Sequence, residues 1–170
     1  MKYLLFLDVD GVLTSQRVHV AHNSKSAMWD RFDPVAVDFF NKLHDTYDDV
    51  SVVLSSSWRQ LVNDESSAVP HWVEATFRCS GFRGKFATPW KTKDLQEKSA
   101  LYHRSYEVLD YLEQAQPEDY LVFDDTDYNF NSLLPKKRFV HTSLIDGLLS
   151  KHMAHTLSLT GNWGKNRWVN

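Results

Sequence analysis

Short, unbroken apolar segments alternate with longer amphipathic segments along this chain. Unbroken apolar segments are typical of strands that are covered on both faces, as in a parallel sheet. Such segments predict three buried strands, at 3–7, 50–54 and 120–123. Two amphipathic segments predict clear helices: one begins at Asp33-Pro34, a cap followed by a first-turn proline, and the other covers 104–115. Weaker patterns predict helices from 58, over 69–82 and over 144–153, short strands at 86–88 (stopped by Pro89) and 138–141, and an irregular tail from 161.

The alternation of strands and helices predicts an α/β fold with a parallel sheet. In such sheets ligands bind outside the carboxyl ends of the strands. The three buried strands end in polar residues that are able to act as ligands: DVDG at 8–11, SSS at 55–57 and DD at 124–125. We therefore expect these residues to meet at one edge of the sheet.

Composition limits the class of protein. A chain of 170 residues, 42% of them hydrophobic, is large enough for a core, and we expect one domain over 1–170. A net charge of −3 gives no overall attraction to nucleic acid, although local basic patches remain open. The single cysteine, Cys79, excludes an intrachain disulfide and a cysteine metal cluster. Because no apolar stretch reaches the roughly 18 residues of a membrane span, we expect a cytoplasmic protein without a membrane partner or an obligate protein partner.

The acidic residues at the strand ends raise a question of charge. Asp8 and Asp10 alone fit either a metal site or an acidic turn after a strand. With Asp124 and Asp125 at the same edge, four carboxylates would repel one another unless a cation lay among them. Oxygen ligands without a thiolate indicate Mg²⁺, which usually takes a substrate phosphate as a further ligand.

The same residues carry a family resemblance. The chain resembles the haloacid dehalogenase (HAD) superfamily of phosphohydrolases: LFLDVDGVLT (5–14) is similar to its first motif, VVLSSSWR (52–59) to its second and YLVFDDTD (120–127) to its fourth. The resemblance covers residues 3 to 147, leaving a C-terminal helix and tail at 148–170. It implies a Rossmann-like three-layer sandwich with a central parallel sheet and no large cap domain. More narrowly, the chain resembles small HAD domains of bacteria and phages that are associated with RNA repair.

The resemblance implies a role for each motif residue. Asp8 would be the nucleophile that carries an aspartyl-phosphate, and Asp10 the general acid and base. Mg²⁺ would be held by Asp8, the Asp10 backbone carbonyl and Asp125, with Asp124 in support. Phosphoryl oxygens would be bound by Ser55 or Ser56 and by a cation of the third motif, for which Arg104 fits best and Lys98 is the alternative.

Two neighbouring residues, Trp58 and Arg59, are candidate substrate contacts, although a tryptophan that packs at the start of a helix is the commoner case. Basic residues available for backbone phosphates are Arg59, Arg83, Lys85, Lys91 and Lys93, and Trp58 or Trp90 would stack a base. The expected function is a Mg²⁺-dependent phosphomonoesterase acting on a nucleotide or a nucleic-acid end. The alternatives are a phosphatase of small metabolites and a binding protein that holds a phosphorylated nucleotide without turnover.

Overall fold

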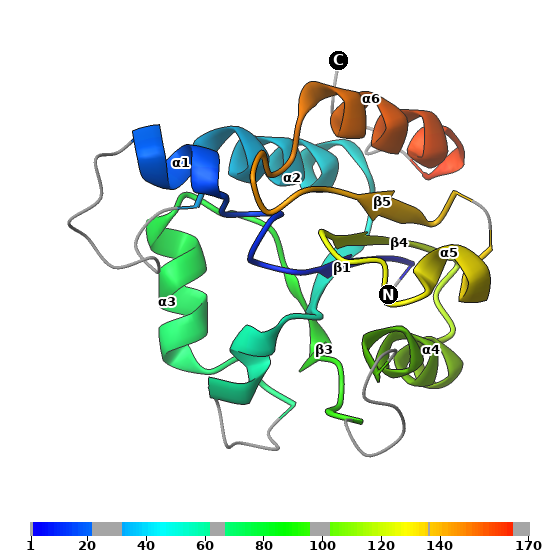
Figure 1. The fold of residues 1–170 in the computed structure, drawn as a ribbon. Coiled ribbons are helices and arrows are strands. Elements are labelled where there is room, and N and C mark those ends of the chain that lie inside the picture. The colour runs from blue at the N-terminus through cyan, green and yellow to red at the C-terminus, as the bar shows by residue number, and fades with distance from the viewer. Residues whose placement is uncertain (1, 22–31, 62–66, 96–102, 136, 165–170) are drawn as a thin grey trace.

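Five parallel strands form a central sheet in the order β3-β2-β1-β4-β5 (Figure 1). The computed structural model describes residues 2–21, 32–61, 67–95, 103–135 and 137–164. The strands are β1 (Tyr3–Leu7), β2 (Val50–Leu54), β3 (Phe86–Lys91), β4 (Asp119–Asp124) and β5 (Phe139–His141). The helices are α1 (Gln16–Ala21), α2 (Pro34–Thr46), α3 (His71–Cys79), α4 (His103–Ala115), α5 (Phe130–Leu133) and α6 (Ser150–Leu159), with 3₁₀ helices at Ser57–Leu61 (η2) and Thr160–Asn162 (η4).

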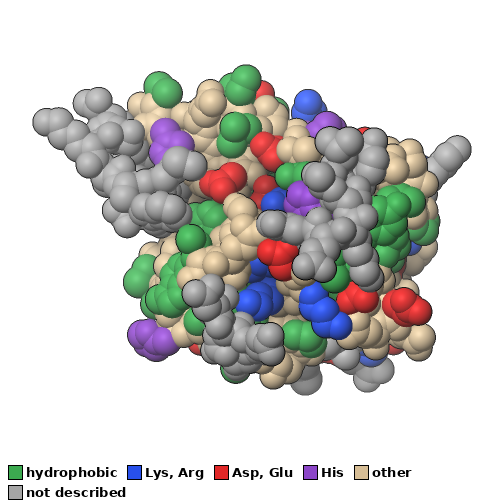
Figure 2. All heavy atoms as spheres, turned by 60° about the horizontal axis from the view of Figure 1, so that its bottom comes forward, with side chains coloured by type: hydrophobic (Ala, Val, Ile, Leu, Met, Phe, Trp, Pro, Cys, Tyr) green, Lys and Arg blue, Asp and Glu red, His purple; other side chains and the backbone are tan. Residues whose placement is uncertain are grey.

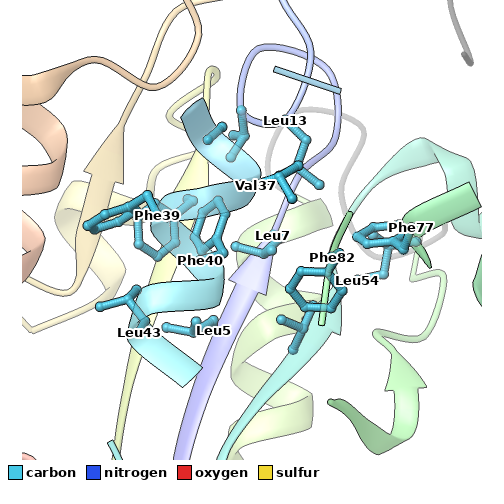
Figure 3. Close-up of a cluster of buried hydrophobic side chains, with 14 of the residues drawn as sticks. Leu5, Leu7, Leu13, Val37, Phe39, Phe40, Leu43, Leu54, Phe77 and Phe82 are labelled. Atoms are coloured by element: carbon cyan, nitrogen blue, oxygen red, sulfur yellow. The ribbon is translucent and has the colours of Figure 1, made fainter. Parts of the chain in front are cut away.

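Helices cover both faces of the sheet, as the α/β prediction requires. One face packs against α2, α3 and the C-terminal segment, around Leu5, Leu7 and Phe40. Figure 3 shows this cluster, in which strand leucines lie between the side chains of α2 and the aromatic rings of Phe77 and Phe82. The other face packs against α4 and α5. The molecule is thus the expected three-layer, Rossmann-like sandwich.

The predicted start of α2 is confirmed in detail. The Asp33 carboxylate accepts a hydrogen bond from the Val35 N–H at 2.9 Å, and Pro34 occupies the first turn. The side chains of Val37, Phe40 and Leu43 are buried, so α2 turns its apolar face to the sheet.

The strand predicted at 86–88 and the helix predicted over 144–153 have other bounds in the structure, and the helix predicted from 58 is a short 3₁₀ helix, η2. The strand β3 continues through Pro89 to Lys91, because β3 is an edge strand and a proline there costs no ladder bond on its open side. The last helix, α6, begins at Ser150 and not at 144, because the carbonyls of Leu144 and Ile145 accept bonds from the backbone N–H groups of Gln16 and Arg17.

The start of the predicted tail, residues 161–164, packs against the sheet, and the rest of it lies outside the described residues. Trp163 is buried and stacks on Tyr3 with ring centroids 4.5 Å apart, and its indole N–H donates to the Asp119 carboxylate at 2.8 Å. Residues beyond the expected core therefore complete the packing at the amino end of β1. None of the described helices combines the length and apolar character that a membrane span needs.

Candidate active site

The carboxyl ends of β1 and β4 bring three carboxylates together. These strands pair in parallel with Leu7 opposite Phe123, and the Asp8 N–H continues the ladder by donating to the Phe123 carbonyl at 2.9 Å. Asp8 therefore lies beside the end of β4, where Asp124 and Asp125 follow. One oxygen from each of the three carboxylates lies within 4.8 Å of the other two. The acidic cluster predicted from the strand ends is thus present for Asp8, Asp124 and Asp125.

A glycine makes this close approach geometrically feasible. Gly11 has a φ of +75°, a left-handed conformation that favours glycine. A Cβ at this position would lie 2.5 Å from the Asp125 Cβ and 2.7 Å from its Oδ2. The glycine of the DVDG motif therefore serves both the turn after β1 and the position of Asp125.

Arg104 supplies the nearest positive charge. Its Nη1 lies 3.2 Å from the Asp8 Oδ1 and 3.0 Å from the Asp124 Oδ2. The guanidinium also lies over the Tyr128 ring, 4.8 Å from its centroid. Burial lowers the pKa of Arg104, but the two carboxylates outweigh burial and raise it above its usual range. Arg104 is therefore a permanent cation beside Asp8, where a phosphate-binding residue is expected; the alternative, Lys98, lies outside the described residues.

The cluster still carries more negative charge than Arg104 balances. Burial raises the pKa of Asp8, and Arg104 and the Ser56 hydroxyl only partly offset it. Burial, and then the charge of Asp8, raises the pKa of Asp124. One guanidinium among three carboxylates leaves a site that a divalent cation would stabilise, and carboxylate oxygens are the ligands that Mg²⁺ prefers. The residues present therefore fit the metal that the sequence predicted.

Asp10 lies apart from this group of three. Its side chain is half-buried, and burial raises the pKa of its carboxyl, whereas a hydrogen bond from the Trp58 side chain lowers it. Among the described residues, no hydrogen-bond partner reaches its buried Oδ1. A carboxyl with a raised pKa retains its proton more readily, which suits a general acid.

The two candidate serines occupy different surroundings. The Ser55 N–H donates to the Leu7 carbonyl at 2.8 Å, which places the end of β2 beside Asp8. The Ser56 hydroxyl hydrogen-bonds to the Asp8 carboxylate, whereas the buried Ser55 Oγ has no partner within the described ranges. Ser56 therefore orients Asp8, and the Ser55 hydroxyl remains available for a phosphoryl oxygen.

The side chains of Trp58 and Arg59 are buried rather than exposed to a substrate. Trp58 is 5% exposed and packs against Phe32, with ring centroids 5.9 Å apart. Arg59 is 2% exposed, and its Nη2 lies 2.6 Å from the Glu107 Oε2. These positions favour packing and a buried ion pair over the substrate contacts that the sequence left open for both residues.

Three other predicted nucleic-acid contacts, Trp90, Arg83 and Lys85, need correction as well, whereas Lys91 and Lys93 lie at and after the carboxyl end of β3 and stay predictions. Trp90 is fully buried and has no free face for a base. Arg83 and Lys85 precede β3 and so lie at the amino edge of the sheet, away from Asp8, where Arg83 pairs with Asp45 at 2.8 Å. Sequence position alone did not show on which side of the sheet these cations lie. On the face in Figure 2, acidic and basic side chains lie beside one another, and its described part shows no extended basic patch.

Sequence reasoning assigned no role to Glu107 or to Tyr128. Glu107 lies three residues after Arg104 on α4, a spacing that places both on one helix face and that would have linked them. Tyr128 lies just beyond the DD of the fourth motif and has a positive φ of 22°, which no sequence pattern indicates.

A scan against protein-family models matches residues 4–153 to the HAD domain in Swiss Army Knife RNA repair proteins. The chain belongs to this family. The match covers β1, β2 and β4, and hence the HAD motifs at the acidic edge, which is the sheet edge with Asp8, Asp124 and Asp125. Membership supports a HAD-type phosphohydrolase in general. Searches of curated proteins and of solved structures found no match.

Proposed function

We propose that this HAD domain is a Mg²⁺-dependent phosphomonoesterase that acts through an aspartyl-phosphate. The observation that carries the proposal is the group of three carboxylates within 4.8 Å of one another, with Arg104 in contact with two of them. A nucleophile, a cation site and a phosphate-binding cation then share one edge of the sheet. Such an arrangement provides what phosphoryl transfer needs, which is positioning and charge stabilisation.

Each residue has a defined part in the proposed reaction. Asp8, oriented by Ser56 and Arg104, attacks phosphorus, and the bond from phosphorus to the leaving oxygen breaks. Asp10 gives its proton to that leaving oxygen and later takes one from the water that hydrolyses the aspartyl-phosphate. Asp8, Asp124, Asp125 and the Asp10 backbone carbonyl would hold Mg²⁺, which supplies positive charge between the nucleophile and the phosphate.

The proposed substrate is a phosphate on a nucleotide or on a nucleic-acid end. This part of the proposal is supported by the family description, which concerns RNA repair proteins. It is also supported by the small size of α1, the one helix described between β1 and α2. This helix has six residues, far fewer than a cap domain. Within the described ranges no cap domain lies over the site, so binding energy would come from the surface beside it, which a large substrate reaches.

The experiment is a phosphatase assay of the wild type and of Asp8→Asn. We expect the wild type to hydrolyse p-nitrophenyl phosphate with Mg²⁺, to lose this activity in EDTA and to regain it when Mg²⁺ is restored. Asp8→Asn should fall to background, whereas Asp45→Asn, a matched change at the exposed Arg83 pair, should not. Near wild-type turnover by Asp8→Asn would exclude Asp8 as the nucleophile, and an enzyme indifferent to EDTA would exclude the metal.

A substrate panel then separates the candidate functions. Mononucleotides, sugar phosphates and oligonucleotides with a 3′- or 5′-phosphate are compared by kcat/KM at two salt concentrations. An advantage of oligonucleotides that shrinks with salt supports the nucleic-acid end, because phosphate contacts release counterions. A salt-independent preference for a sugar phosphate would favour the small-metabolite phosphatase. Tight binding of a nucleotide without turnover would favour the binding protein, which the intact Asp8 and Asp10 argue against.

A further inference from the structure

A buried ion pair joins η2 to α4, the helix that carries Arg104. Arg59 of η2 and Glu107 of α4 are 2% and 0% exposed in their side chains, and the Arg59 Nη2 lies 2.6 Å from the Glu107 Oε2. Taking two charges out of water is costly, and a buried pair is often no more stabilising than apolar residues of similar size. A contribution to stability alone therefore does not account for this pair.

Arg59 also connects this pair, through Ser56, to Asp8, the proposed nucleophile. Its Nη1 donates to the Ser56 carbonyl at 2.9 Å, and the same carbonyl accepts the Arg59 backbone N–H at 3.1 Å. The Ser56 hydroxyl in turn hydrogen-bonds to the Asp8 carboxylate. Three consecutive contacts thus connect Glu107 to Asp8, through Arg59 and Ser56.

Glu107 also binds one further segment, the loop after β3. Its Oε1 accepts the Leu95 N–H at 3.1 Å, which holds the loop after β3. It also lies one turn from Arg104 on α4, so its position and that of Arg104 are set by the same helix. One carboxylate therefore joins η2, the loop after β3 and the helix that carries the phosphate-binding cation.

We infer that Arg59 and Glu107 are positioning residues that fix the Ser55–Ser56 turn and Arg104 relative to Asp8. The inference rests on the proposed phosphatase function, and it replaces the substrate contact that the sequence offered for Arg59. Neither side chain touches the phosphate. They act through the Ser56 backbone and through α4, because a small displacement of either one moves a hydroxyl or a guanidinium away from the reacting oxygens.

The test separates positioning from stability with a double variant. Arg59→Met with Glu107→Gln removes both buried charges together and leaves the Leu95 N–H its acceptor. We expect this variant to unfold thermally close to the wild type, and its kcat on p-nitrophenyl phosphate to fall roughly tenfold to hundredfold. Arg83→Met with Asp45→Asn, the same kind of change at an exposed pair, is the control and should leave kcat unchanged.

A second readout does not depend on turnover. Hydrogen exchange of the backbone N–H groups at 55–61 should become faster in the double variant, while exchange in β1 and β4 stays unchanged. Wild-type kcat and unchanged exchange in a stable double variant would overturn the inference. If the wild type hydrolyses none of the phosphates, the proposed function fails, and the exchange rates alone decide whether the pair holds this turn.

A third variant covers failure of the double variant to fold. Arg59→Lys keeps a positive charge beside Glu107 but replaces the guanidinium that bonds both Glu107 and the Ser56 carbonyl. We expect a folded protein with lowered kcat and faster exchange at 55–61. A folded Arg59→Lys with wild-type values for both would also overturn the inference.

Discussion

Replacement of Gly11 by alanine tests the geometry of the acidic edge most directly. The φ of +75° costs a residue with a Cβ about 1–2 kcal/mol. The new Cβ would also meet the Asp125 side chain at 2.5 Å, a collision that forces Asp125 to move, and such overpacking costs about 1–3 kcal/mol. We expect Gly11→Ala to lower the free energy of unfolding by about 2–5 kcal/mol.

Gly81 provides a matched control. It has a similar φ of +89°, but a Cβ there would meet nothing within 4 Å. Gly81→Ala should therefore cost only the backbone term of about 1–2 kcal/mol. Urea unfolding of both variants in EDTA measures the two costs, and their difference isolates the collision with Asp125.

The same pair of variants reports on the proposed metal site. Because Gly11→Ala displaces Asp125, we expect Mg²⁺ affinity measured by calorimetry to fall about tenfold to hundredfold, and Gly81→Ala to bind as the wild type does. Equal unfolding costs for the two variants, together with an unchanged Mg²⁺ titration of Gly11→Ala, would refute the reasoning from the close approach.

Two further predictions concern charge. Arg104→Ala should lower kcat roughly 10²-fold, because Arg104 contacts Asp8 and Asp124 at the point where phosphate charge develops; a greater loss in Lys98→Ala under the same assay would reverse the assignment of the third motif. Burial lowers the pKa of His44 from 6.5 to about 4, so as the pH falls below 6.5 the unfolded chain gains a proton that the folded protein does not take up. The wild type should therefore lose about 2 kcal/mol of unfolding free energy between pH 7 and pH 5 relative to His44→Gln, and identical pH profiles of the two proteins would contradict the burial of His44 as the cause.

The elements that the sequence predicted well are those whose pattern is local. The segments 3–7 and 50–54 form β1 and β2 with the predicted bounds, and the third strand extends one residue beyond 120–123 at each end. The same holds for the 104–115 helix, which begins one residue earlier. An unbroken apolar run or a 3.6-residue period depends on neighbours in the chain, and parallel pairing then places the ends of the strands at one edge. For this reason the sequence alone predicted a cluster of Asp8, Asp10, Asp124 and Asp125, of which the structure brings Asp8, Asp124 and Asp125 within 4.8 Å of one another.

What the sequence could not decide is which partner each remaining polar or aromatic side chain meets. Arg59 looks like a surface cation until α4 brings Glu107, 48 residues away, against it. Trp58 and Trp90 were predicted to stack a base, but packing buries both. Arg83 was predicted to bind phosphate near the site, but it precedes β3 and so lies at the opposite edge of the sheet. The sequence of the tail does not show that Trp163 stacks on Tyr3, at the start of the chain. In each case the contact joins residues that are distant in sequence, and its energy depends on burial, which exists only after the sheet and its helices have assembled.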